Sequence, residues 1–346
     1  MNDLNRLSFV SDYMEGAHPL ILQRLAETNM LKTAGYGLDE FSMSAKNRIR
    51  NACMAPEADV FFLAGGTQTN AVIISSLLRP YQGVISAQSG HVSVHEAGAI
   101  EFGGHKVLTL PHQDGKLCAE SIVDCMEEYL NDQNRDHTVM PGMVYISHPT
   151  EYGTLYSLEE LLGISSACRR YGLPLYLDGA RLAYALACPE NDVSLTDLSS
   201  LCDVFYIGGT KCGALFGEAV VIPQHNLIPH LFTMIKQYGA LLAKGRITAI
   251  QFDVLFEDDL YLRIGMPAIE AAKRIRAALD DKGYDIAMRS PTNQIFIVLD
   301  REKAAALSER IEMGFMEQVD DSRVLMRIAT SWATLPEDVD RLITCL

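Results

Sequence analysis

The chain has 346 residues and a mass of 38.2 kDa, enough for two domains or for one large α/β domain with a smaller addition. Apolar residues make up 48% of the chain and charged residues 21%, a balance that excludes disordered, collagen-like and coiled-coil proteins. The 29 basic and 44 acidic residues give a formal net charge of −15, so neither bulk nucleic-acid binding nor attraction to anionic membranes is expected.

The sequence also indicates the cellular compartment in which the protein is expected. Residues 1–6 contain no basic stretch followed by an apolar one, and no apolar run approaches the ~18 residues that a membrane-spanning helix needs. We therefore expect neither a signal peptide nor a transmembrane segment. The eight cysteines are scattered without a Cys-x-x-Cys pair, which favours free thiols in a reducing cytoplasm.

Short apolar runs rich in β-branched and aromatic residues alternate with helical segments over the first two thirds of the chain. The runs are 60–63, 84–86, 107–110, 143–146, 173–177, 204–207 and 219–222. Between most of them lie segments with helical spacing, such as 157–171, which opens with Ser157 and Glu160 in the pattern of a capping box. This alternation predicts an α/β domain with a mainly parallel sheet covered on both faces.

The pattern changes after about residue 250. A long helical stretch is expected at about 260–282, a strand at 294–299, a helix near 301–313 and a strand at 324–329. These elements predict a smaller α+β domain at 251–346. The large domain would then cover 1–250, including an N-terminal arm.

Residues 63–70 follow the first predicted strand and open a helix. Gly65 and Gly66 let the backbone approach a ligand closely, and the N-terminus of the apolar helix that follows, with residues 71–74, offers free N–H groups that suit phosphate. The alternative is a plain strand-to-helix turn. The glycine spacing matches neither a P-loop nor a dinucleotide fingerprint.

Two histidines, His91 and His95, stand four positions apart and would share one face of a helix. Such a pair suits zinc, but the segment lacks the second histidine of the His-Glu-x-x-His pattern, so no metal is expected. A histidine here would instead stack on a planar ring, or serve a structural or capping role.

Asp178 ends the strand at 173–177, and Arg181 follows three residues later. Open α/β sheets bind their ligands at the carboxyl ends of strands, which makes this acid a candidate for a site. The alternative is an Asp178 that caps a helix, with an incidental arginine.

Lys211 comes just after the strand at 204–207 and has glycines on both sides. A lysine in that place would lose solvent, its amine pKa would fall, and the amine would become nucleophilic. The alternative is a solvated lysine in a loop.

Arg327 interrupts an apolar strand of the smaller domain. A buried guanidinium needs an anionic partner, because an isolated buried charge is costly. That partner is either a ligand carboxylate or the acid of an internal salt bridge.

The order of these features is that of a pyridoxal-phosphate enzyme with the aspartate-aminotransferase-like fold, known as fold type I. This cofactor needs an anion cradle, a stacking ring, an acid against its pyridine nitrogen and a Schiff-base lysine. The chain resembles the low-specificity L-threonine aldolases of the β-eliminating lyase family, almost from end to end. The residues that carry the resemblance are 10–12, 36–37, 66–70, His91, 96–98, 178–181, 210–211, 291–293 and Arg327.

The resemblance implies a role for each matching residue around pyridoxal 5'-phosphate. Lys211 would bind the cofactor covalently, Asp178 would pair with its ring nitrogen, and His91 would stack on the ring. Gly66 and Thr67 would bind the phosphate.

The resemblance also implies the remainder of the site. Thr210 and Arg181 would belong to the cofactor site, and Arg327, with Ser11 and Arg181, would hold the substrate carboxylate. Tyr36 would reach the site of a neighbouring subunit, so a homodimer or homotetramer with shared active sites is expected.

The chain departs from the family at one catalytic position. Many members carry a histidine in the loop after the strand at 143–147, where this chain has Glu151. Glu151 and His91 are thus the candidates for the base that removes the β-hydroxyl proton. The implied reaction cleaves L-threonine, L-allo-threonine or a related β-hydroxy-α-amino acid to glycine and an aldehyde. Two competing hypotheses are β-elimination from another amino acid and a sugar- or nucleotide-binding α/β protein without catalysis.

Overall fold

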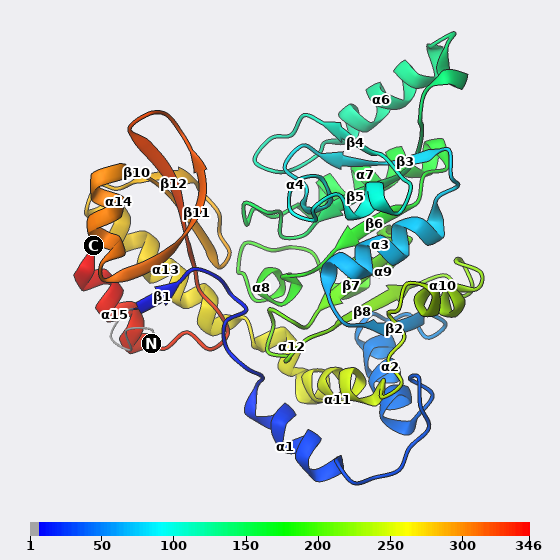
Figure 1. Ribbon diagram of the computed structural model, residues 1–346, viewed down its shortest axis with the longest axis horizontal. Coiled ribbons are helices and arrows are strands. Elements are labelled where there is room, and N and C mark those ends of the chain that lie inside the picture. The colour runs from blue at the N-terminus through cyan, green and yellow to red at the C-terminus, as the bar shows by residue number, and fades with distance from the viewer. Residues whose placement is uncertain (1–6) are drawn as a thin grey trace.

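The computed structural model describes residues 7–346, which fold into two parts, each built on its own β-sheet (Figure 1). The larger part contains a seven-stranded sheet and the smaller part a five-stranded sheet. Residues 1–6, to which the expected absence of a signal peptide refers, lie outside the described residues. The α/β architecture confirms the fold class predicted from the alternation of strands and helices.

The seven-stranded sheet is mainly parallel. Its order is β2-β8-β7-β6-β5-β3-β4, and β8 runs antiparallel to its neighbours β2 and β7. Each apolar run predicted as a strand falls on one of its members. The strands are β2 (Asp59–Leu63), β3 (Gln82–Ala87), β4 (Val107–Leu110), β5 (Met140–Ser147), β6 (Leu175–Asp178), β7 (Val204–Gly208) and β8 (Glu218–Ile222).

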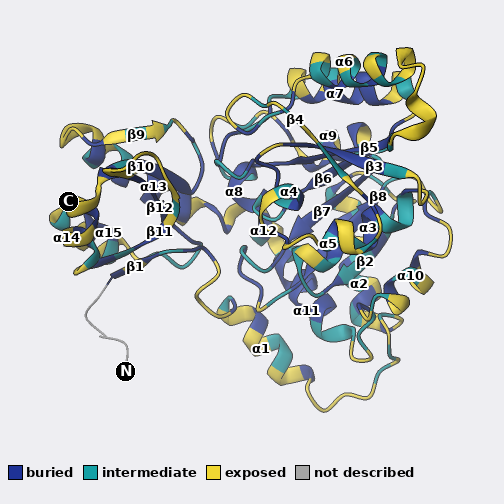
Figure 2. Cartoon of the chain, turned by 45° about the horizontal axis from the view of Figure 1, so that its top comes forward, coloured by how far each residue is buried: buried dark blue, intermediate teal, exposed yellow. Residues whose placement is uncertain are grey.

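Both faces of this sheet are buried, as Figure 2 shows for its central strands. Alternate residues of a strand point to opposite faces, so Val144 and Ile146 of β5 belong to one hydrophobic core and Tyr145 to another. Tyr176 and Tyr206, on the next two strands, lie on the same face as Tyr145, and neighbouring rings are in contact. This row of tyrosines leads towards the carboxyl end of β6.

Helices cover the two faces of the larger sheet. The predicted capping box opens α7: the Ser157 hydroxyl accepts from the backbone N–H of Glu160 at 3.1 Å, and the Glu160 carboxylate accepts from the N–H of Ser157 at 2.8 Å. The helices of this part are α1 (Pro19–Thr28), α2 (Glu40–Ala52), α3 (Gly66–Leu77), α4 (His91–Val94), α5 (Ala99–Phe102), α6 (Ala119–Asn131), α7 (Leu158–Tyr171), α8 (Leu182–Leu186), α9 (Leu195–Leu201), α10 (Leu231–Gln237), α11 (Arg246–Leu255) and α12 (Leu260–Arg263), with 3-10 turns η1 (Arg135–His137) and η2 (Glu257–Asp259).

The smaller sheet has the order β1-β11-β12-β10-β9, with β1 parallel to β11 and the other pairs antiparallel. The predicted helix at 301–313 is wrong in its last residues. Ile311 begins β11 and is fully buried beside its partner Leu7 of β1, so tertiary packing overrides the local pattern. The elements are β1 (Leu7–Phe9), β9 (Asp285–Met288), β10 (Gln294–Asp300), β11 (Ile311–Gln318) and β12 (Arg323–Ala329), with α13 (Met266–Asp281), α14 (Arg301–Ser308) and α15 (Pro336–Cys345).

The long helix predicted at about 260–282 is divided into α12 and α13. The break includes Gly265, where a Cβ would lie 2.5 Å from the backbone oxygen of Ala183, too close for any side chain. The hydrophobic core of the larger part extends to Ile269, whereas β1 pairs within the smaller sheet. The division of the chain into domains at residue 250 stays a prediction.

Two further expectations concern the whole chain. All eight cysteines are free in the structure, as predicted from their scattered positions. Within residues 7–346, no helix is both long enough and apolar enough to cross a bilayer.

Candidate active site

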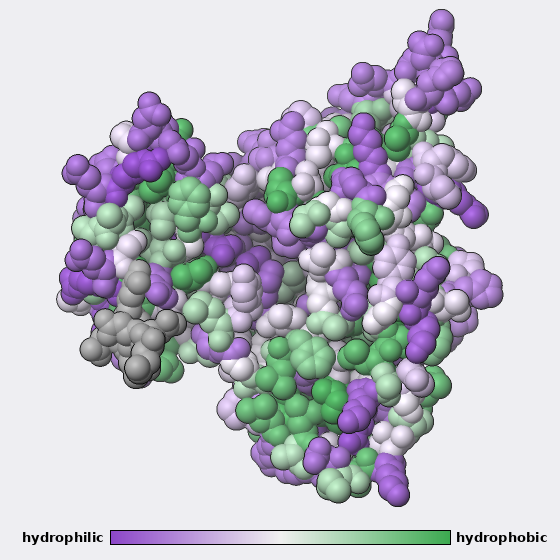
Figure 3. Space-filling view, viewed as in Figure 1, coloured by the Kyte–Doolittle hydropathy of each residue, from purple (hydrophilic) through white to green (hydrophobic). Residues whose placement is uncertain are grey.

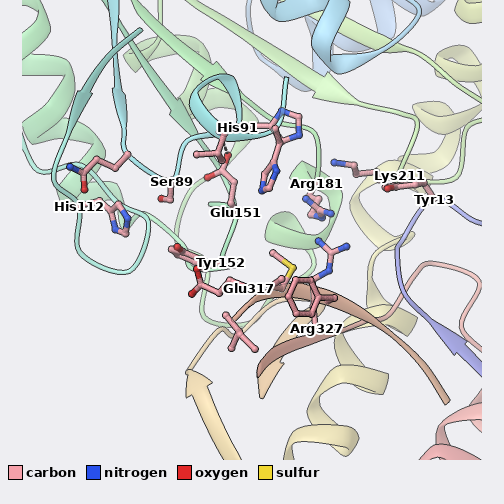
Figure 4. Close-up of a pocket in the computed structure, with 16 residues that line it drawn as sticks. Tyr13, Ser89, His91, His112, Glu151, Tyr152, Arg181, Lys211, Glu317 and Arg327 are labelled. Atoms are coloured by element: carbon pink, nitrogen blue, oxygen red, sulfur yellow. Dashed lines mark hydrogen bonds between the residues drawn. The ribbon is translucent and has the colours of Figure 1, made fainter. Parts of the chain in front are cut away.

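A pocket of about 610 Å³ lies between the two parts of the chain. The loops that follow β3, β4, β5, β6 and β7 form one side of it, and residues of β11 and β12 form the other (Figure 4). Figure 3 shows the corresponding hollow between the two parts, with hydrophilic residues around it. Because the carboxyl ends of parallel strands meet at this edge, the pocket has the usual location of a ligand site in an α/β sheet.

Lys211 lines this pocket from the loop after β7. Its backbone oxygen accepts a hydrogen bond from the hydroxyl of Tyr184 at 2.6 Å, which fixes the loop. Burial, and then the positive charge of Arg181, lowers the pKa of the Lys211 amine below its ordinary value, although Asp12 opposes this effect. The amine is therefore more easily freed of its proton than a surface lysine, as a nucleophile requires.

Asp178 ends β6 behind the wall of the pocket and is only 4% exposed. Its carboxylate accepts hydrogen bonds from the hydroxyls of Tyr206 at 2.5 Å and Tyr145 at 2.6 Å, and from the backbone N–H of Ala180 at 2.9 Å. Burial alone would raise the pKa of Asp178, but the nearby His91 and the tyrosine hydrogen bonds lower it overall. The acid is thus held in its charged form, which suits a protonated ring nitrogen.

The loops around Asp178 and Lys211 approach each other more closely than side chains would allow. A Cβ at Gly179 would lie 2.1 Å from the backbone oxygen of Tyr206, and one at Gly208 would lie 2.4 Å from that of Ala180. Only glycine fits at these two positions. The contact ties the end of β6 to the end of β7, and thereby places the acid and the amine at one site.

His91 is the first residue of α4 and also lines the pocket. Its ring nitrogen Nδ1 lies 2.8 Å from the carboxylate oxygen Oε1 of Glu96. That oxygen also accepts a hydrogen bond from the amide of Asn70 at 2.7 Å. A buried acid and amide therefore set the orientation of the imidazole that was expected to stack on the cofactor.

Glu151 follows β5 and is part of the same pocket wall. Its oxygen Oε1 accepts hydrogen bonds from the hydroxyl of Ser147 at 2.7 Å and from the backbone N–H of His91 at 2.9 Å. Burial raises the pKa of Glu151, and the Ser147 hydrogen bond only partly offsets this effect. The carboxyl group therefore anchors the start of α4. Its role as a base stays a prediction.

Two arginines enter the pocket, from opposite sides. Arg181 forms a bidentate ion pair with Asp12, at 2.6 and 3.0 Å. Arg327 instead donates to the side chain of Gln294 at 3.1 Å and to the backbone oxygen of Val10 at 3.0 Å. Since both of these partners of Arg327 are neutral, its positive charge is available to a ligand carboxylate.

The expected phosphate-binding residues stand at the start of α3. Gly66 is the first residue of this helix, and the side chain of Thr67 is exposed. A Cβ at Gly66 would lie 3.2 Å from the hydroxyl oxygen of Tyr206, which binds Asp178. The helix N-terminus with its unpaired N–H groups is thus close to the acid, as one ligand with a ring and a phosphate would require.

Thr210, just before Lys211, is held by a buried acid that the sequence did not indicate. The Thr210 hydroxyl donates to Glu218 at 2.8 Å, and the backbone N–H of Gly209 donates to the other carboxylate oxygen at 3.1 Å. Glu218 is 3% exposed, and burial raises its pKa to about 8. This acid fixes the two residues that precede the lysine.

Tyr36, an expected site residue, is not among the residues that line this pocket. It lines a separate small cavity with Phe61 and Leu38, and the ammonium of Lys236 lies 4.9 Å from the centre of its ring. Within one chain, Tyr36 therefore takes no part in the pocket of Lys211. Its expected role in a neighbouring subunit stays a prediction.

The residues present fit pyridoxal 5'-phosphate. Ser89 and Arg327 line the pocket, and each has a buried polar atom, Oγ and Nε respectively, without a hydrogen-bond partner in the described residues. The hydroxyl of Ser11 is likewise buried without a hydrogen-bond partner in the described residues, and Ser11 stands in sequence between Val10 and Asp12, which bind the two arginines. Buried polar atoms without partners are costly, so they indicate a polar ligand at this site.

Several residues of the site were not assigned a role from the sequence. Local patterns give little sign of their roles, because most of them act through contacts that are distant in the chain, and Glu218 acts through a contact between the ends of two strands. They are Asp12, Asn70, Tyr145, Tyr206, Glu218 and Gln294.

Comparison with known proteins gives consistent results. A family model described as beta-eliminating lyase matches residues 8–302. The low specificity L-threonine aldolase of Pseudomonas aeruginosa is 32% identical over 307 residues, which cover 87% of each chain. The solved structure of Leishmania major threonine aldolase is 44% identical, covers 98% of each chain and superposes with a TM-score of 0.94. Thermus thermophilus aspartate aminotransferase is 14% identical, covers 99% of this chain and 91% of its own, and shares the fold with a TM-score of 0.72.

Proposed function

The chain belongs to the beta-eliminating lyase family, and we propose that it cleaves a β-hydroxy-α-amino acid, such as L-threonine or L-allo-threonine, to glycine and an aldehyde. Pyridoxal 5'-phosphate is the cofactor of this family, and it supplies a conjugated ring that takes up electrons from a bond at Cα. The observation that carries the proposal is a desolvated lysine, Lys211, in one pocket with the guanidinium groups of Arg181 and Arg327.

The residues that would hold the cofactor come from four loops of the larger part. Lys211 would bind it covalently through its amine, and the charged Asp178 would keep the ring nitrogen protonated. His91 would stack on the ring, oriented by its contact with Glu96. The N-terminus of α3, with Gly66, would receive the phosphate, because free N–H groups and the helix dipole favour a dianion.

The substrate carboxylate would bind between the two parts of the chain. Among residues 7–346, neither the buried Nε of Arg327 nor the buried hydroxyl of Ser11 has a hydrogen-bond partner. Arg181 adds positive charge, although Asp12 already occupies two of its donors. A clamp of this kind orients the bond at Cα that is to be broken, which is a large part of catalysis by enzymes of this type.

A β-elimination from another amino acid is the second candidate. Glu151, which stands where many aldolases have a histidine, keeps this reaction open as an alternative. The product assay separates the two reactions. Glycine and acetaldehyde from L-threonine would support the aldolase, whereas ammonia and an α-keto acid would support the lyase.

The covalent role of Lys211 has a direct test. Borohydride reduction of the protein with bound pyridoxal phosphate, followed by peptide mass mapping, should place the adduct on Lys211. An adduct on Lys244 instead, or no absorption band after addition of the cofactor, would contradict the proposal. The Lys211→Ala variant should lose the reducible adduct.

We also propose a homodimer or homotetramer in the cytoplasm, in which Tyr36 serves a neighbouring site. Exposed apolar residues gather on α1 and on the segment that follows it, near Tyr36, and Figure 3 shows a hydrophobic patch below the hollow, where α1 lies. Patches of this kind usually mark interfaces. The residues are Leu20, Leu22, Met30, Leu31 and Leu38. Light scattering of the wild type and of Leu31→Asp would test the assembly.

A further inference from the structure

His95 is a residue of the active-site pocket that the proposed mechanism does not yet use. It directly follows α4 and lines the cavity together with Lys211 and Arg327. The centre of its ring lies 5.7 Å from that of His91, and the two ring planes are inclined by 55°. Neither ring nitrogen of His95 makes a hydrogen bond with any residue in the described range 7–346. The imidazole is therefore available to a ligand.

Three other candidate bases of the pocket are already engaged. His91 is tied through Nδ1 to Glu96 at 2.8 Å. Glu151 receives two hydrogen bonds on one oxygen, including the one that anchors α4. In His112, Nδ1 accepts the backbone N–H of Gly115 at 3.0 Å and so belongs to a turn. A group that takes a proton from the substrate must be free to reach it.

The charges around His95 favour its neutral form. Partial burial lowers the pKa of the imidazole, and electrostatic interactions with His91, Arg327, Arg181 and Lys211 lower it further. A neutral imidazole has a lone pair for a proton at physiological pH. Once protonated, it would be repelled by the same cations, so it would release the proton readily.

We propose that His95 is the general base for the β-hydroxyl group of the substrate, an inference that rests on the proposed function. A ring nitrogen of His95 takes the hydroxyl proton, and the electron pair of the O–H bond forms the carbonyl bond of the departing aldehyde. The Cα–Cβ bond breaks, and its electron pair stays with Cα, with the conjugated cofactor as electron acceptor. A proton added at Cα then gives glycine. The proton on His95 returns to solvent, so no further reactant is needed.

The test uses the enzyme with bound cofactor and the variant His95→Asn, which keeps a polar side chain but removes the base. Release of acetaldehyde from L-threonine should fall by about 10²–10⁴-fold. The exchange of the α-hydrogens of glycine with deuterium from solvent, followed by NMR, should stay near the wild-type value, because it involves no β-hydroxyl group. The cofactor absorption band and the unfolding midpoint should also be unchanged.

His112→Asn is the matched control, because it removes an imidazole from the same pocket and should retain aldehyde release. A His95→Asn enzyme that releases aldehyde at the wild-type rate would overturn the inference. So would an equal loss of aldehyde release and glycine exchange, which would indicate a structural role. Absence of both activities in the wild type would overturn the proposed function, and this inference with it.

Discussion

Asp12 and Arg181 are 169 positions apart in the chain, and their side chains form a two-point ion pair at 2.6 and 3.0 Å. The carboxylate of Asp12 is fully buried and also accepts a hydrogen bond from the amide of Asn293 at 2.9 Å. The pair therefore ties the N-terminal segment and the smaller part to the loop after β6. It keeps Arg181 at the pocket while balancing its charge.

Removal of this carboxylate should destabilise the fold. We expect Asp12→Asn to lower the free energy of unfolding by about 3–5 kcal/mol at pH 7, because a buried guanidinium loses its counter-charge. Urea unfolding measures the difference. Asp320→Asn, which breaks an exposed pair with Arg323, is the control and should leave the midpoint almost unchanged. Equal stability of Asp12→Asn and the wild type would show that the pair contributes nothing.

The same residue predicts a pH dependence. Burial alone would raise the pKa of Asp12, but Arg181 and Lys211 lower it from 3.8 to about 2 in the folded protein. A lowered folded-state pKa stabilises the fold above pH 3.8, and the contribution of about 2 kcal/mol is lost as the pH falls towards 2. Acid unfolding curves of the wild type should show this loss, and those of Asp12→Asn should lack it.

Asn70 should control the affinity for the cofactor. Its amide nitrogen donates to Glu96 at 2.7 Å and to Asp178 at 3.2 Å, so it stands between two buried carboxylates. In Asn70→Ala each of these two carboxylates would lose one hydrogen-bond donor. We expect cofactor binding to weaken by about 1–3 kcal/mol, or roughly 5- to 150-fold, in an absorbance titration. Asn70→Asp should weaken it more, because it adds a third negative charge. The prediction fails if Asn70→Asp binds as well as the wild type.

Arg327 should determine binding of the substrate rather than of the cofactor. Loss of a charge-assisted contact in Arg327→Ala should raise KM for the amino acid about 10- to 100-fold. Cofactor titration should give the wild-type affinity, since Lys211 and Asp178 are untouched. Arg323→Ala, on the same strand but exposed and paired with Asp320, is the matched control. A change in cofactor affinity without a change in KM would contradict the role in substrate binding that is proposed for Arg327.

Glu218 should make the stability of the cofactor-free protein depend on pH. Burial raises its pKa from 4.5 to about 8. A raised folded-state pKa means that the stabilising effect is complete below pH 4.5 and disappears as the pH rises through 8. The free energy of unfolding should thus fall more steeply between pH 5 and 8 in the wild type than in Glu218→Gln. Parallel pH profiles of the two proteins in urea unfolding would exclude this effect.

Much of the larger part was predictable because its signals are local. Apolar runs identified the strands of the larger sheet, and the Ser157 capping box identified the start of α7. Strand ends also placed Asp178 and Lys211 at one edge, because parallel strands of a sheet end on the same side. The helix predicted at 301–313 was wrong in its last residues. These residues form a strand, because they are buried against β1.

The order of the amino acids was thus enough to identify the fold class, the family resemblance, and the acid and amine of the site. Only the folded chain showed the contacts that hold those groups in place. They are the ion pair of Asp12 with Arg181, the hydrogen bonds of Asn70 to two buried carboxylates, and the hydrogen bond from Thr210 to Glu218. The folded chain also showed that His95 lines the pocket and that its ring nitrogens have no hydrogen-bond partner among the described residues. The two kinds of information differ in the sequence separation of the residues involved. Periodicity and strand ends are properties of neighbouring residues, whereas hydrogen bonds between distant residues and desolvation exist only once the chain is packed.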